Sequence, residues 1–189
     1  MPHKRVGEQG EMPELHVDMC FLGEENDPHN TITVMVARER STRMTMATVV
    51  PAKSARSFTS RRLVAFIKEV GILHGDLLVK SDQEPAVKAI LSDAGRVRSS
   101  EGGGRYITEQ SPVGSSASNG VVERAIQSVE QQVRVLKSAV EGCWGVKLET
   151  RHPAIPWITE HAAVLLNRFE VGHDGKTCLL YTSQSPRDS

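Results

Sequence analysis

The 189 residues of this chain are enough for one well-packed domain and too few for two comfortable ones. Hydrophobic residues make up 39% and charged residues 24%, and 23 basic residues balance 23 acidic ones, so the bulk charge does not indicate a nucleic-acid partner. No apolar run approaches the roughly 18 residues of a membrane span, and the three cysteines lack the C-x-x-C spacing of a thiolate zinc site or a disulfide framework.

Three short segments rich in Val, Ile, Thr and Met predict β-strands at the start of the chain. They are ELHVDMCFL (14–22), TITVMVAR (31–38) and RMTMATVV (43–50). The intervening GEENDPHN and ERST are turn-forming sequences, so we expect the three strands to be antiparallel neighbours.

Helical and strand patterns alternate over the rest of the chain. Helices are predicted at 54–71, 84–95, 119–140 and 153–170, with strands at 76–82 and 105–111 and a loop at 111–119. Gly71 and Gly95 are expected to end the first two helices. Because strands joined through helices run parallel, the order predicts an α/β fold. Its sheet would be mixed and five-stranded, with three antiparallel strands followed by parallel ones, and flanked by helices.

The last twelve residues, CLLYTSQSPRDS (178–189), have no periodicity. Residues 178–183 resemble a library-preparation adaptor translated in frame. We therefore expect a non-native tail at 178–189, and we expect the natural chain to continue past Thr177. The alternative is a genuine disordered tail.

Three carboxylates occupy positions that suggest a functional role. Asp18 lies within the apolar first strand, where an unpaired buried acid is costly. Asp82 ends the fourth strand, where acids often cap the following helix. Glu123 is expected in the first turn of the long helix, where the helix dipole favours an acid by about 0.3–1 kcal/mol. Each has an ordinary structural explanation when taken alone.

Taken together, the three carboxylates predict a site for divalent cations. Strand ends and adjoining helix starts gather functional groups in open α/β sheets. Three oxygen donors at one point would repel each other unless cations lay between them, and Mg²⁺ prefers such ligands. Two ions about 3.5–4 Å apart would support an in-line displacement at phosphorus.

The same residues resemble a known family. HVDMCF (16–21), LLVKSDQEPA (77–86) and SPVGSSASNGVVERAIQSV (111–129) are similar to the Asp, Asp and Glu motifs of the integrase catalytic core of retroviruses and long-terminal-repeat retrotransposons. The resemblance covers about residues 12–177 and implies a ribonuclease-H-like fold. It also implies that Asp18, Asp82 and Glu123 are the metal-binding catalytic triad, and that residues 104–118 form a loop that closes on DNA.

The resemblance implies a polynucleotidyl transferase that joins the 3′ ends of element DNA to target DNA. It implies two Mg²⁺ or Mn²⁺ ions as cofactors, DNA as the partner, and a homodimer or higher oligomer. A nuclear location after a cytoplasmic pre-integration stage is expected. The alternatives are a ribonuclease-H-type nuclease and an inactive or domesticated copy that only binds DNA or protein.

The resemblance has two departures. The interval from Asp82 to Glu123 is longer than usual in the retroviral motif, and the surplus is expected in SSEGGGR (99–105). Neither a zinc-binding module upstream nor a basic module downstream is recognised. We therefore expect an N-terminal flank at 1–12 and a catalytic core at 13–177, as a fragment of a polyprotein.

Several other residues are candidates for the site. Glu84 and Glu109 are alternatives to Glu123 as the third ligand, and His16 shares a strand face with Asp18. Trp144 and Trp157 are expected in the core or at a subunit interface. The basic run at 38–68 is either a solvated face or a phosphate-binding surface. DNA contacts are assigned to five residues at the start and on the polar side of the long helix, where ordinary surface roles are the alternative: Asn119, Arg124, Gln127, Arg134 and Lys137.

Overall fold

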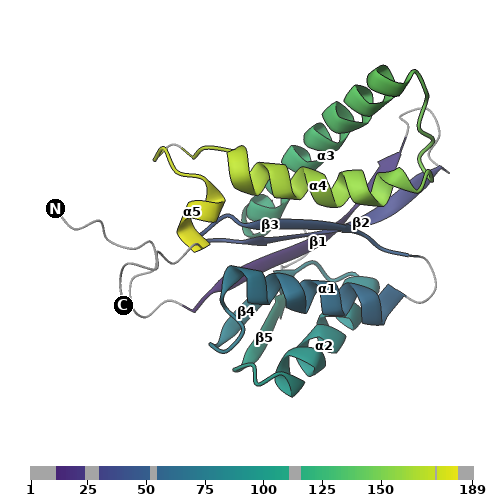
Figure 1. The fold of residues 1–189 in the computed structure, drawn as a ribbon. Coiled ribbons are helices and arrows are strands. Elements are labelled where there is room, and N and C mark those ends of the chain that lie inside the picture. The colour runs from purple at the N-terminus through teal and green to yellow at the C-terminus, as the bar shows by residue number, and fades with distance from the viewer. Residues whose placement is uncertain (1–11, 24–29, 52–54, 111–115, 173, 183–189) are drawn as a thin grey trace.

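The structure, a computed structural model, describes residues 12–23, 30–51, 55–110, 116–172 and 174–182. Within these residues, five strands and five helices follow one another (Figure 1). The strands are β1 (Glu14–Gly23), β2 (Thr31–Glu39), β3 (Thr45–Val49), β4 (Leu77–Ser81) and β5 (Tyr106–Gln110). The helices are α1 (Ala55–Val70), α2 (Pro85–Ser100), α3 (Ser116–Trp144), α4 (Ala154–Phe169) and α5 (Cys178–Thr182).

The five strands form one mixed sheet in the order β3-β2-β1-β4-β5. β1 pairs antiparallel with β2, and β2 pairs antiparallel with β3, as their turn-forming connections predicted. β4 is parallel to both β1 and β5, because a helix precedes and follows it in the chain. The predicted mixed five-stranded sheet is therefore confirmed.

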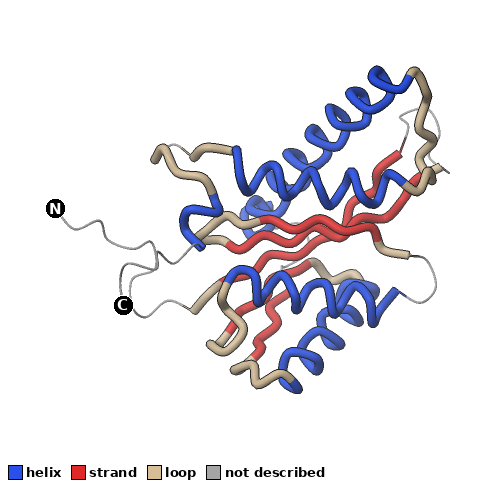
Figure 2. The backbone as a smooth tube through the Cα atoms, viewed as in Figure 1, coloured by secondary structure: helices blue, strands red, loops and turns tan. Residues whose placement is uncertain are grey.

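Helices cover both faces of this sheet, with α1 and α2 on one side and α3 and α4 on the other (Figure 2). The interior strand β2 is apolar toward both layers, because successive side chains of a strand point to opposite faces. Met35 and Ala37 join the core under α1 and α2, whereas Val34 and Val36 join the core under α3 and α4.

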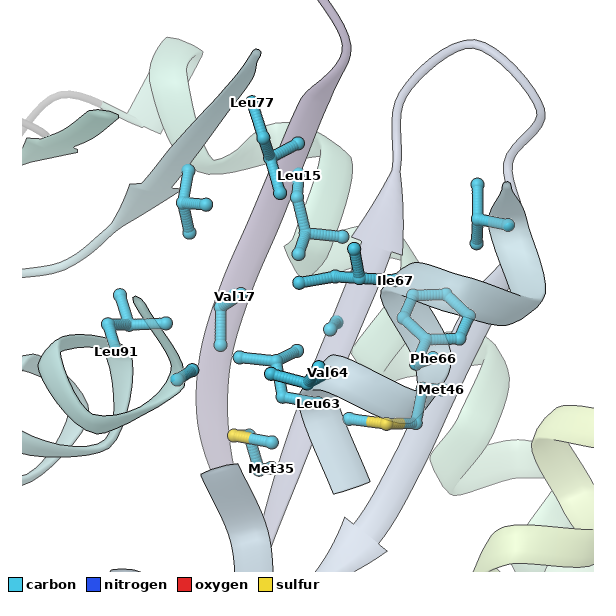
Figure 3. Packing of buried hydrophobic residues seen from close by; sticks show 14 of the residues in the cluster. Leu15, Val17, Met35, Met46, Leu63, Val64, Phe66, Ile67, Leu77 and Leu91 are labelled. Atoms are coloured by element: carbon cyan, nitrogen blue, oxygen red, sulfur yellow. The ribbon is translucent and has the colours of Figure 1, made fainter. Parts of the chain in front are cut away.

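The first of these cores is built from β1 and the two helices that follow the antiparallel strands. Figure 3 shows Leu15 and Val17 of β1 among the side chains of Leu63 and Ile67 from α1 and Leu91 from α2. All five are less than 3% exposed, so this layer holds the α1 and α2 side of the molecule together.

Three helix boundaries differ from the predictions, and one of them is the end of α3, which continues past Val140 to Trp144. α2 continues past Gly95 to Ser100, so Gly95 does not end the helix. A Cβ at Gly95 would lie 3.0 Å from the Tyr106 ring, so the glycine instead lets β5 pack closely against α2. α3 begins at Ser116, within the expected loop at 111–119. Residues 111–115 of that loop lie outside the described part of the chain.

The expected surplus at 99–105 is only partly a loop, because Ser99 and Ser100 belong to α2. The turn that follows is organised by Arg98, whose side chain is 0% exposed. Its guanidinium donates to the carbonyl oxygens of Gly104 (2.6 Å), Arg105 (3.3 Å) and Ile72 (3.2 Å), and to that of Gly75. One side chain thereby joins the end of α2 to the segments that lead into β4 and β5.

The segment from Cys178, predicted to begin a non-native tail, is partly described by the structure. Residues Cys178–Thr182 form the short helix α5, and Cys178 is 4% exposed within the core under α1 and α2. Residues 183–189 lie outside the described part of the chain, and the non-native tail at 178–189 stays a prediction.

Candidate active site

Asp18 and Asp82 lie side by side where two parallel strands separate. Val17 of β1 is the register partner of Ser81 of β4, and an aspartate follows each of them. Neighbouring strands lie about 4.8 Å apart. The pairing of β1 with β4 therefore brings together two acids that are far apart in the sequence.

A backbone amide holds one oxygen of each aspartate. The Met19 N–H donates to Oδ1 of Asp18 (2.8 Å), and the Glu84 N–H donates to Oδ1 of Asp82 (3.1 Å). Asp82 is not the N-cap of α2, since that position belongs to Glu84, which makes no side-chain cap bond. The helix-capping explanation of Asp82 is therefore wrong, although its side chain does order the turn before α2.

Glu123 lies about two turns into α3, because the helix already begins at Ser116. The helix dipole acts mainly within the first turn, and no acid lies in the first turn of α3. The ordinary explanation of Glu123 as a helix-start acid therefore fails. α3 packs across β1 and β2 through Val122, Ala125 and Val129, and Glu123 itself is exposed.

The electrostatics of Asp18 connect these acids. Burial raises the pKa of Asp18 above its ordinary value, and the hydrogen bond from the Met19 N–H opposes that change. The negative charges of Asp82, Glu84 and Glu123 raise the pKa further, in that order of size. Carboxylates from the end of β4, the start of α2 and the second turn of α3 thus act on Asp18 of β1.

The donor chemistry of this cluster suits a hard divalent cation, which prefers several carboxylate oxygens and would relieve their mutual repulsion. The side chains are not drawn together into a formed ligand set. Across the described ranges, no group of three or more His, Cys, Asp or Glu side chains is arranged to hold a metal ion.

The alternative ligands separate clearly. Glu84 is half-buried close to Asp82, and its charge influences Asp18 more than that of Glu123, so its place as an alternative third ligand stays open. Glu109 is exposed on β5 and is not among the charges that shift Asp18.

His16 is 3% exposed and lies on β1 two residues before Asp18. Its Nε2 is 3.5 Å from Oε1 of Glu14, and burial lowers the pKa of the imidazole. A packed histidine of the sheet accounts for these observations, and we assign His16 no part in the site.

The residues predicted to contact DNA occupy the solvent side of α3. Arg124, Gln127 and Arg134 are exposed, whereas Lys137 is 24% exposed and lies 3.8 Å from Glu141. Asn119 belongs to α3, but its side chain lies outside the described part. Trp144 and Trp157 are 67% and 63% exposed, so the core interpretation of both is wrong.

Comparison with known proteins supports the fold. No protein-family model matches the chain, and no curated protein matches it in sequence. The HTLV-2 integrase catalytic core domain in complex with magnesium is similar in structure. Its trimeric form gives a TM-score of 0.58 at 14% identity, and its dimeric form gives 0.57 at 13%. In both cases the similarity covers 93% of this chain and 100% of that domain.

A second similar structure is the simian T-cell lymphotropic virus intasome in complex with the PP2A regulatory subunit B56 gamma. Its TM-score is 0.64 at 18% identity over all of this chain, which spans 60% of the length of that one. Identities this low show the fold alone. The ribonuclease-H-like arrangement of integrase cores is thereby confirmed. None of the described helices is long and apolar enough to cross a membrane.

Proposed function

We propose that this chain is the catalytic core of a retroelement integrase, a metal-dependent polynucleotidyl transferase that joins the 3′ ends of element DNA to target DNA. The observation that carries the proposal is the convergence of carboxylate charges from separate elements on Asp18, at the end of the sheet where β1 and β4 part. The integrase-core fold gives that convergence a chemical interpretation.

Asp18, Asp82 and Glu123 are the residues that would hold the metal. Two bound Mg²⁺ or Mn²⁺ ions would supply an activated attacking oxygen and stabilise the leaving oxygen at a DNA phosphodiester. Backbone amides hold one oxygen of Asp18 and one oxygen of Asp82. The second oxygen of each carboxylate would then bind a cation. The protein contributes position and charge, with little covalent chemistry of its own.

DNA and a second copy of the chain are the proposed partners. Arg124, Gln127, Arg134 and Lys137 of α3, together with Asn119, would meet DNA phosphates beside Glu123. Trp157 and Val164 on α4, 63% and 39% exposed, provide an apolar surface for dimerisation. The HTLV-2 domain has been solved as a dimer and as a trimer, which is in keeping with this assignment. A nuclear location after a cytoplasmic stage follows from the same proposal.

Substitution of the proposed ligands tests the function. In a disintegration assay of the 189-residue chain with Mg²⁺ or Mn²⁺, Asp82→Asn and Glu123→Gln should each lower the rate at least about 10²-fold, because each removes a carboxylate that would hold the cations against the reacting phosphate. Glu84→Gln is the matched control, since it removes a nearby charge that the proposal does not use. It should keep most of the activity.

The outcomes separate the competing functions. An active Asp82→Asn enzyme contradicts the catalytic assignment. If Glu84→Gln loses activity while Glu123→Gln stays active, the third ligand is Glu84 and not Glu123. Cleavage of the RNA strand of a hybrid, without action on DNA ends, indicates a ribonuclease-H-type nuclease. An inactive wild-type chain that still binds DNA indicates the decayed or domesticated copy.

A further inference from the structure

A second polar surface lies on the opposite layer of the molecule from α3, between α2 and the edge strand β5. It is a groove of about 650 Å³. One wall consists of α2 residues that recur at helical spacing and so lie on one face of that helix: Lys88, Leu91, Ser92, Gly95, Arg96 and Ser99. Its β5 wall alternates, as one face of a strand must: Tyr106, Thr108 and Gln110.

The groove carries cations along its whole length. Lys88, Arg96 and Arg105 line it, and no acidic side chain is among its lining residues in the described part of the chain. Two of the cations are partly neutralised from outside, because Arg96 pairs with Asp93 and Arg105 pairs with Asp76 (2.5 Å). The groove thus keeps a positive excess centred on Lys88, near Asp82.

The floor and the hydroxyl groups complete the chemistry. Gly95 leaves room for the Tyr106 ring, which forms an apolar floor together with Leu91. Ser92 and Thr108 add hydroxyl donors on the two walls. Cations and hydroxyls above an apolar floor are the groups that contact the sugar–phosphate backbone of nucleic acids.

The length of the groove suits more than one phosphate. From Lys88 to Ser99 the helix rises about 16 Å, and β5 extends for a similar distance beside it. Ser81 and Gln110, which are register partners at the carboxyl ends of β4 and β5, mark the end of the groove that approaches Asp82. The groove therefore leads away from the candidate active site.

We propose that the α2–β5 groove is an additional binding surface for the DNA backbone, outside the contacts assigned to α3. The naming of DNA as its ligand rests on the proposed function. The groove positions a strand that enters or leaves the site at Asp82, and it takes no part in the chemistry.

Salt dependence of DNA binding tests this proposal. Binding of the 189-residue chain to a fluorescein-labelled duplex is followed by anisotropy over a range of KCl concentrations. Lys88→Ala and Arg96→Ala should each reduce the slope of log affinity against log salt by about 0.9, because each removes one phosphate contact. Lys88→Arg should restore the slope. Arg168→Ala, an exposed cation on α4 outside the groove, is the matched control.

Each possible result bears on the groove and on the proposed function in a different way. If the wild-type chain binds DNA with a slope that Lys88→Ala and Arg96→Ala leave unchanged, the groove proposal is overturned and the proposed function stands. If the wild-type chain binds no DNA, both proposals fail. A third outcome is that inorganic phosphate raises the melting temperature of the wild type but not of a variant that combines Lys88→Ala and Arg96→Ala, while the salt slopes of DNA binding are the same for both proteins. The groove is then a small-anion site, and the DNA assignment is overturned.

Discussion

Glu14 is the residue at which three strands are joined by charge. Its Oε2 accepts a hydrogen bond from Arg40 Nη1 (2.6 Å), just beyond β2, and its Oε1 lies against Lys80 Nζ of β4. Burial of Glu14 raises the cost of ionisation, but the hydrogen bonds from Lys80 and Arg40 and their charges outweigh it. The pKa of Glu14 is therefore lowered from its ordinary value of 4.5.

This lowered pKa predicts a pH-dependent contribution to stability. Because the folded state holds the Glu14 proton more weakly than the unfolded chain, the stabilisation is present above the ordinary pKa and is lost as the pH falls through the folded pKa. Glu14→Gln should lower the free energy of unfolding at pH 7 by about 1–3 kcal/mol. The difference from the wild type should shrink toward zero in acid.

Urea denaturation at neutral and acidic pH measures this difference. Glu69→Gln is the control, because Glu69 is 54% exposed and its pairing with Arg62 at 3.4 Å is a surface contact of little energetic value. A Glu14→Gln deficit that persists unchanged in acid would show that packing, rather than charge, supplies the stabilisation.

At the scale of elements, the arrangement of α2, β4 and β5 depends on a buried cation. Arg98 meets four backbone carbonyl oxygens and no carboxylate among the described residues, so its guanidinium acts as a bridge between loops. Backbone atoms of His74 and Gly75 lie close to Gly104. A Cβ at Gly104 would lie 2.6 Å from the Gly75 carbonyl oxygen, so glycine is required at 104.

Removal of this bridge should be costly. Arg98→Met should lower the free energy of unfolding by at least about 3 kcal/mol, because several buried carbonyl groups lose their donor. Arg98→Lys should recover little of this loss, since one compact ammonium group cannot reach all four carbonyls. Arg96→Met, on the exposed side of the same helix, is the control and should change stability by less than about 0.5 kcal/mol. If Arg98→Met and Arg96→Met lower the free energy of unfolding equally in chemical denaturation, the role of Arg98 as a bridge is refuted.

At the scale of the whole molecule, α4 presents apolar side chains to solvent. Trp157 is 63% exposed and stacks on His161 with ring centroids 4.8 Å apart, and Val164 lies two helical turns further on. Large exposed apolar patches of this kind mark interaction surfaces more often than free surface. The opposite side of α4 is buried against β3 and α3, so its exposed side is available for a partner.

We expect Trp157→Lys to shift the chain from dimer to monomer, because a charge at the centre of an apolar interface is left unpaired on association. Sedimentation velocity at micromolar concentrations measures the change. Ile107→Lys is the control, since Ile107 is 39% exposed on β5, the edge strand opposite to β3, against which α4 packs. A dimer that resists Trp157→Lys, or a monomeric wild type, would contradict this interface.

The sequence by itself determined the elements and most of the sheet. Alternation in 14–22 and 31–38, with turn-forming residues between them, predicts an antiparallel pair from neighbouring residues alone. The three acids of the motifs could be named in the same way, although their role as metal ligands stays a prediction. Local patterns carry this information because hydrogen bonding within helices and turns depends on nearby residues.

Only the tertiary structure decided which side chains meet. The register of β1 against β4 places Asp82 beside Asp18, and the start of α2 adds the charge of Glu84 to the cluster. Gly95 lets Tyr106 pack closely against α2 and does not end the helix, and the burial of Arg98 depends on carbonyl groups from two separate segments. These contacts join residues that are distant along the chain. Their energies come from packing and from shared desolvation, which no local periodicity encodes.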